Sequence, residues 1–233
     1  MKSFLRLGFA AVTLTLFFGA FAAIETNAQN ILPEILKRME AHRNSLTSLR
    51  TNVTMVKIND QLKEKDVTEG TASYLPAKGR DALIRIDWTK PVEETLAVVN
   101  KKYVIFTPRR KSAIVGNASA AKGSGKANNL FAFINMSKDE LKANFVIKYL
   151  GQENISGGAQ TWHLEMTPKN PASFKFKSAD MWVDTDGMPR QIKITENNKD
   201  TTSLLLSNLQ KNATIKASVF KVDLPKGTKI IDG

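Results

Sequence analysis

The residues that could carry acid–base or metal chemistry are few in this chain and lie far apart. His42 and His163 are the only histidines, and there is no cysteine. A zinc site needs three or four ligands at close spacing, and neither histidine has such companions. Glu93 and Glu94 could form a catalytic carboxylate pair, but a charged pair just after Pro91 is typical of an exposed turn. No serine stands in a nucleophile-elbow sequence. We therefore expect neither a metal site nor an enzyme.

Two loop sequences resemble ligand-binding motifs and lack their essential parts. The stretch 120–127 is similar to a phosphate-binding loop, without its first glycine and its final Ser or Thr. The stretch 184–187, Asp-Thr-Asp-Gly, is similar to the start of a calcium loop, without the acidic residue that completes one. The same four residues suit a hairpin turn. We expect a turn there and no cofactor.

The first 28 residues have the pattern of an export signal. Lys2 and Arg6 precede an apolar run over 9–23, and small residues occupy 26–28. We predict cleavage before Gln29 and one domain over 29–233. An uncleaved membrane anchor is the alternative, which the small residues at the cleavage positions disfavour. Without cysteine, the exported domain depends on its core for stability.

The chain is strongly basic, with a formal net charge of +12. An exported chain with dispersed basic residues is not expected to bind nucleic acid. An anionic membrane surface or an acidic partner is the better expectation, and plain solubility is the alternative.

From residue 49 onward, apolar side chains recur mainly at every second position, which is typical of β-strands. In the central meander, Ile84, Ile86 and Trp88 share one face, while Arg85 and Asp87 share the other. The pattern predicts about eleven antiparallel strands, at 49–59, 67–75, 80–88, 95–100, 103–107, 111–115, 146–151, 161–167, 174–184, 190–196 and 202–209. A short edge segment is expected near 230–231.

One long and two short helices are also predicted. The long helix starts near Asn30 and Pro33 and is amphipathic. The short ones are expected at 130–134 and 139–145, the second begun by a capping box of Ser137 and Glu140. The Ala-, Ser- and Gly-rich stretch 116–129 is predicted to be a mobile loop. Helices against a curved sheet would enclose either a filled core or an apolar cavity.

Several short segments resemble the periplasmic outer-membrane lipoprotein carrier proteins, in the same order and spacing. They are the helix at 35–49, Asp-Trp-Thr-Lys-Pro at 87–91, residues 103–108, Trp-Val-Asp-Thr-Asp-Gly at 182–187 and the ending at 220–227. The resemblance covers nearly all of the chain after the signal. It implies a mainly β (α+β) fold, an unclosed and strongly curved antiparallel barrel with helices as a lid over an apolar cavity.

The resemblance also implies a function. Such a protein is a periplasmic carrier that holds the acyl chains of lipoproteins and ferries them from the inner to the outer membrane. Its partners would be an inner-membrane ATP-driven release complex and an outer-membrane receptor, and we expect a monomer. The family places an arginine that bonds to the lid eleven residues before the turn proline, which is Arg80 here, with Lys78 as the alternative. The expected cavity residues are the in-facing strand positions plus the first short helix: Ile84, Ile86, Trp88, Leu96, Val98, Phe131, Phe133 and Met136.

Other functions fit the same patterns. A related periplasmic domain that binds a lipid or glycolipid, or senses lipoproteins, could have an identical cavity. A structural exported β-domain with a filled core is a further alternative.

Overall fold

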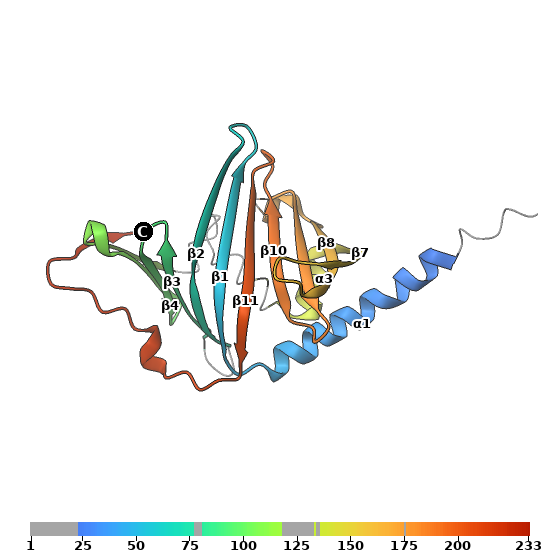
Figure 1. The fold of residues 1–233 in the computed structure, drawn as a ribbon, viewed down its shortest axis with the longest axis horizontal. Coiled ribbons are helices and arrows are strands. Elements are labelled where there is room, and N and C mark those ends of the chain that lie inside the picture. Colours follow the sequence, from blue (N-terminus) through green and yellow to red (C-terminus); the bar gives the residue numbers. More distant parts are fainter. Residues whose placement is uncertain (1–22, 77–80, 118–132, 134–135, 175) are drawn as a thin grey trace, which may run out of the picture.

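The computed structural model describes residues 23–76, 81–117, 133, 136–174 and 176–233. Within these ranges there are two α-helices, three short 3₁₀ helices and twelve strands (Figure 1). The helices are α1 (Ala23–Ser45), α3 (Lys138–Asn144), η1 (Pro108–Arg110), η2 (Pro171–Ser173) and η3 (Ala217–Phe220). The strands are β1 (Leu49–Asn59), β2 (Glu64–Leu75), β3 (Leu83–Lys90), β4 (Glu94–Val99), β5 (Lys102–Thr107), β6 (Ser112–Asn117), β7 (Phe145–Asn154), β8 (Gln160–Pro168), β9 (Ser178–Asp184), β10 (Pro189–Thr195), β11 (Thr201–Lys211) and β12 (Lys229–Asp232).

All twelve strands form one curved sheet that does not close on itself. Their order is β12-β6-β5-β4-β3-β2-β1-β11-β10-β9-β8-β7, so β12 and β7 are the two edges. Every pairing is antiparallel except that of β12 with β6, which is parallel. The predicted unclosed antiparallel sheet is therefore confirmed, with one strand more than the expected eleven. The additional strand is the expected edge segment of the tail, whose residues 229–232 pair with 112–115.

The helices differ in part from the prediction. Helix α1 begins at Ala23, and Pro33 lies inside it rather than at its start. Proline is common in a first helical turn, and this preference misplaced the predicted start. Helix α3 begins as predicted, because the Ser137 side chain accepts from the Glu140 N–H and the Glu140 carboxylate accepts from the Ser137 N–H. Signal cleavage remains a prediction. Neither α-helix in the described ranges is long and apolar enough to cross a membrane.

The stretches 118–132 and 134–135 lie outside the described residues. Most of the predicted loop at 116–129 and of the short helix at 130–134 therefore lie there too. Gly116 and Asn117 end strand β6, and Phe133 is described.

Helix α1 is fixed to the sheet at the turn between β9 and β10. Gly187 in this turn has a φ of 86°, and a Cβ there would lie 2.3 Å from the Arg38 carbonyl oxygen of α1. Only glycine combines that conformation with so close an approach. The Arg38 guanidinium donates to the Thr185 carbonyl at 3.1 Å. The predicted hairpin turn at 184–187 thus also forms the surface against which α1 packs.

A second, smaller core lies on the other face of the sheet, away from α1. Leu75, Leu83 and Phe220 are buried together there. Phe220 belongs to the C-terminal strap, the segment 212–228 that runs from β11 across the outer side of the sheet to β12 (Figure 1). The strap thus covers the outward-facing apolar residues of β2 and β3, which alternate with the inward-facing ones.

Arg85 ties the strap to the sheet. Its guanidinium donates to the carbonyls of Val219 and Lys221, both at 3.0 Å. The same group makes a bidentate pair with Asp87, with both N···O distances at 2.8 Å. The hydrogen bond to Asp87 is the main reason why the pKa of Arg85 is raised. One side chain therefore joins the middle of the strap to the outer face of β3.

We expect Arg85→Leu to lower the free energy of unfolding by about 1–2 kcal/mol, since charged hydrogen bonds are lost at a partly solvated site. Urea denaturation measures this change. Arg50→Leu is the matched control, because Arg50 is exposed and should change stability by less than about 0.5 kcal/mol. Equal stability of the two variants would show that the strap does not depend on Arg85.

Candidate functional site

The inner face of β3, β4 and β5 carries two apolar rows that cross the strands. In one row Ile86 lies opposite Leu96, and Leu96 lies opposite Ile105. In the other, Ile84 lies opposite Val98. Directly opposed side chains in antiparallel strands pack against one another, so each row is a continuous apolar strip.

The structure places seven of the predicted cavity residues in one hydrophobic cluster. Ile86, Leu96, Trp88 and Phe133 are buried in it, with exposures of 0%, 4%, 6% and 3%. Ile84, Val98 and Met136 are partly buried and pack against it. Phe131 and Arg80 lie outside the described residues, as does Lys78. The cluster, called the inner core below, also contains the buried side chains of α1 and α3.

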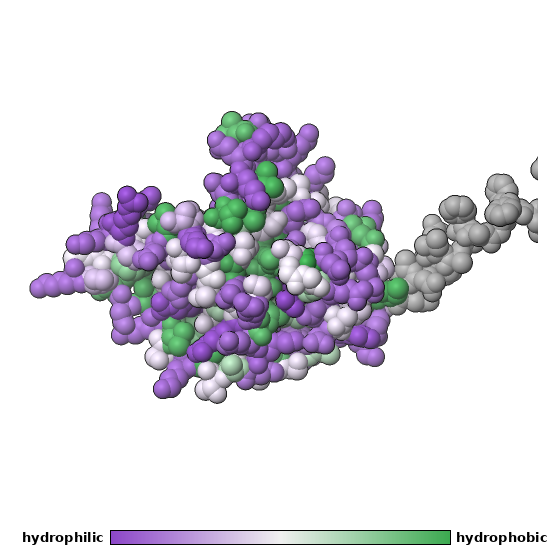
Figure 2. Space-filling model, viewed as in Figure 1, coloured by the Kyte–Doolittle hydropathy of each residue, from purple (hydrophilic) through white to green (hydrophobic). Residues whose placement is uncertain are grey.

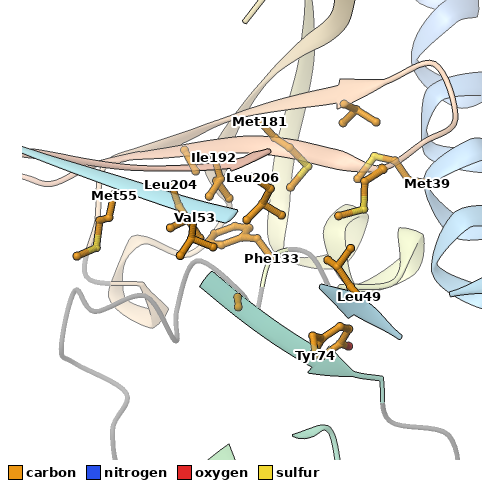
Figure 3. Close-up of a cluster of buried hydrophobic side chains, with 14 of the residues drawn as sticks. Met39, Leu49, Val53, Met55, Tyr74, Phe133, Met181, Ile192, Leu204 and Leu206 are labelled. Atoms are coloured by element: carbon orange, nitrogen blue, oxygen red, sulfur yellow. The ribbon is translucent and has the colours of Figure 1, made fainter. Parts of the chain in front are cut away.

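Phe133 is buried against the inner face of the sheet. It lies among the side chains of Val53 from β1 and Leu206 from β11 (Figure 3). Its ring is 5.6 Å from that of Phe145 and 5.9 Å from that of Phe176. Phe133 therefore covers the middle of the inner face.

Methionine is concentrated in the inner core. The chain has seven methionines, and the six that lie in the described residues are all in this cluster or packed against it. They come from the first helix, the region before α3, three strands and the turn between β9 and β10: Met39, Met55, Met136, Met166, Met181 and Met188. Methionine is flexible and polarizable, and it adapts to apolar partners of different shapes. The inner core can therefore rearrange more easily than one built from branched side chains.

Two small spaces border the inner core in the described part of the chain. One lies between β9, β10 and β11 and is lined by Met181, Ile192 and Leu204. The other lies between α1 and the start of β10, lined by His42, Met136 and Pro189. Each has room for about one water molecule. Neither of these two spaces can hold a long apolar ligand unless the neighbouring side chains move.

Sequence reasoning missed the contribution of the central strands. Val53 and Met55 of β1, and Leu204 and Leu206 of β11, are buried on the same inner face (Figure 3). The signal was present, because these residues also alternate at period two. The stretch 174–184, predicted as one strand, is a strand only from Ser178. Phe174 and Phe176 lie before it, and their rings pack near Phe145 instead of extending the strand.

Several polar groups outside the inner core lie close to one another. On the outer face, His163 lies 2.9 Å from Glu153 and 2.8 Å from Asp180, and its ring stacks on Trp182. Glu40 links the two helices, because it pairs with Arg43 and accepts from the Lys138 N–H at 2.9 Å. These two hydrogen bonds lower the pKa of Glu40. In the described ranges no group of three or more His, Asp and Glu residues could hold a metal ion.

His42 lines the space between α1 and the start of β10, together with Met136. Its Nε2 is buried and has no hydrogen-bond partner among the described residues, and burial is the main reason why the pKa of this imidazole is lowered. The positive charge of Lys211 lowers the pKa further, whereas Asp184 and Asp186 raise it. The folded protein therefore favours a neutral His42.

Folding stability should consequently depend on pH through His42. The unfolded chain takes up the proton first as the pH falls through about 6.5, so stability is lost on acidification by up to about 1.4 kcal/mol per pH unit. We expect His42→Gln, which cannot take up this proton, to have a smaller slope in urea denaturation between pH 7.5 and 5.5. Ala41→Gln, at an exposed position next to it, is the control and should keep the slope. Identical slopes in all three proteins would contradict the role of His42.

The geometry is that of a half-barrel, a single curved sheet whose apolar side packs against helices. The sequence model of the outer membrane lipoprotein carrier protein LolA matches residues 59–223. This is more than half of the chain, which therefore belongs to that family of carrier proteins. The comparison with curated protein sequences finds no significant match.

One solved structure supports the same fold, and two others are similar over much of the chain. An uncharacterized conserved protein from Thermus thermophilus has a TM-score of 0.55 and 13% identity, over 87% of this chain and 99% of that one. A LolA superfamily protein from Nitrosomonas europaea has a TM-score of 0.40 and 14% identity, over 82% and 97%. LprF from Mycobacterium bovis has a TM-score of 0.48 and 14% identity, over 85% and 98%. With 13% identity, the similarity to the Thermus thermophilus protein concerns the fold alone.

Proposed function

We propose that this protein is a periplasmic carrier that holds the acyl chains of lipoproteins against the inner face of its sheet and moves them from the inner to the outer membrane. The observation that carries the proposal is the continuous, methionine-rich inner core on a sheet that stays open. Membership in the carrier family supports it. An ATP-driven inner-membrane complex as donor and an outer-membrane receptor as acceptor belong to the same proposal.

The energetics explain why a carrier is needed. An exposed methylene costs about 0.8 kcal/mol, so one sixteen-carbon chain costs roughly 12 kcal/mol in water. Free diffusion of a lipoprotein from one membrane to the other is therefore negligible. The inner face must cover the chains, yet release them to an acceptor. Flexible methionines suit this compromise, because they can fill the space in the empty protein and move aside for the cargo.

Native mass spectrometry of protein purified from the periplasm tests the proposal. We expect acylated protein to co-purify and to be displaced by a fluorescent fatty-acyl probe. Free lipid or glycolipid in its place would support a lipid-binding or sensing domain. Failure to bind any acyl compound, including the probe, would favour a structural domain with a permanently filled core.

Arg80 is proposed as the residue that favours the closed, empty state, on the strength of the family resemblance. A charged hydrogen bond of about 1.5–3 kcal/mol corresponds to roughly 10- to 100-fold in the equilibrium between open and closed forms. We expect Arg80→Leu to accept a lipoprotein but to release it poorly, and Arg80→Lys to be intermediate, because lysine lacks the forked geometry. The measurement is transfer from loaded protein to added acceptor. Lys78→Leu is the control. Normal release by the Arg80→Leu variant would mean that Lys78 has this role or that neither residue has it.

A further inference from the structure

Five exposed basic residues gather at one corner of the sheet, far from α1 (Figure 1). They come from two segments, 109–111 in the connection from β5 to β6 and 226–229 at the start of β12: Arg109, Arg110, Lys111, Lys226 and Lys229. We call this the basic corner. The Lys229 N–H donates to the Lys111 carbonyl at 2.8 Å, so the two segments lie side by side. Hydrophilic side chains project from this side of the molecule in Figure 2.

The charges of the basic corner are not neutralised within the described part of the chain. None of the five residues has a carboxylate within ion-pair distance there, whereas Lys221 nearby pairs with Asp223 at 2.9 Å. The acidic residues on the adjacent end of β4 are Glu93, which is exposed, and Glu94, whose carboxylate accepts from the Thr107 hydroxyl at 3.3 Å. The corner therefore has an excess of positive charge that an anionic surface would neutralise.

Two large apolar side chains adjoin the basic corner. Ile230 and Ile231 follow Lys229 on the edge strand β12 and are 62% and 41% exposed. Successive residues in a strand point to opposite faces, so both sides of this edge are apolar. An exposed apolar edge strand can pair with other chains and cause aggregation, so proteins usually avoid one. Basic residues next to exposed apolar ones are the combination that binds at a lipid interface.

We propose that the basic corner and the two isoleucines form a docking site for an anionic membrane surface. Lysine and arginine would contact lipid phosphates, while Ile230 and Ile231 would enter the boundary between headgroups and acyl chains. A corner can meet a flat bilayer without steric hindrance. Docking in this way leaves α1, at the other end of the molecule, away from the membrane (Figure 1). The proposal does not depend on acyl binding by the inner core.

Cosedimentation of the purified protein with vesicles tests the proposal. We expect binding to phosphatidylcholine vesicles that contain phosphatidylglycerol and much weaker binding to phosphatidylcholine alone. Each basic residue near an anionic surface contributes roughly fivefold, so the triple variant Arg109→Gln, Arg110→Gln, Lys229→Gln should bind about a hundredfold more weakly. Added salt should weaken binding of the parent protein, because exposed charges are screened over about 8 Å at physiological ionic strength.

A matched triple variant separates this site from net charge. Lys37, Lys57 and Lys65 are exposed elsewhere, and changing all three to glutamine alters the net charge equally. We expect this control to lose only a few-fold in vesicle binding. Equal losses in the two triple variants would overturn the proposal. So would equal binding to neutral vesicles, or binding to polyglutamate without binding to vesicles, which would indicate an acidic protein partner.

Two further measurements complete the test. Changing Ile230 and Ile231 to serine should reduce the binding that persists in high salt, and unchanged binding would exclude the apolar contribution. The affinity of the Arg109, Arg110 and Lys229 variant for a fatty-acyl probe should equal that of the parent. Loss of probe binding in this variant would show a general structural effect and would overturn the assignment of a separate membrane site.

Discussion

Replacing Ile86 with glutamate is expected to weaken binding of a fluorescent fatty-acyl probe by at least about a hundredfold. Ile86 is fully buried on the inner face, between Ala72 of β2 and Leu96 of β4. A carboxylate there would have to be desolvated when acyl chains cover it, at a cost of several kcal/mol. Titration of the purified variant with the probe measures the effect.

The control for this prediction is the same substitution at a solvated position. Ile58 is 41% exposed near the tip of the β1–β2 hairpin, so Ile58→Glu should bind the probe like the parent. Circular dichroism and urea denaturation establish whether each variant is folded. Ile86→Thr provides a milder change if the glutamate variant does not fold, and its binding should fall by a smaller factor. Unchanged binding by a folded Ile86→Glu protein would remove Ile86 from the site.

The second large effect is expected in the smaller core on the outer face of the sheet. Phe220 is 1% exposed and packs with Leu75 and Leu83 beneath the C-terminal strap. Truncation of a buried phenylalanine to alanine typically costs about 3–5 kcal/mol, because apolar contacts are lost and a cavity remains. We expect Phe220→Ala to lower the free energy of unfolding by about this amount in urea denaturation.

Val219 is the matched control, since it precedes Phe220 in the strap and is only partly buried against the same core. Val219→Ala should cost about 1 kcal/mol or less. If Phe220→Ala costs no more than Val219→Ala, the strap contributes little to folding. Acyl-probe binding by the folded fraction of the Phe220→Ala variant would show whether the strap also supports the strands that carry Ile86.

Alternation of apolar residues was sufficient to predict most strands, because each strand has one face turned to a core. Residues two positions apart point to the same face for this reason, as Val53 and Met55 or Ile84 and Ile86 point to the inner face. The capping box at Ser137 was also readable, since it depends on residues only three positions apart. A local hydrogen-bonding motif of this kind can be predicted without knowledge of distant contacts. The role of Arg80 remains a prediction from family resemblance, and that of Phe131 remains a prediction from the apolar short helix.

The sequence by itself therefore determined the class of fold, the period-two faces and the turn at 184–187, all of which depend on neighbours in the chain. Only the tertiary structure decided what those faces meet. It paired β12 in parallel with β6 and placed Lys229 beside Lys111, although more than a hundred residues separate them. It also set the Arg85 side chain against the carbonyls of Val219 and Lys221. Contacts between such distant segments depend on how the whole sheet curves and on where the strap crosses it, and no periodicity in the sequence encodes them.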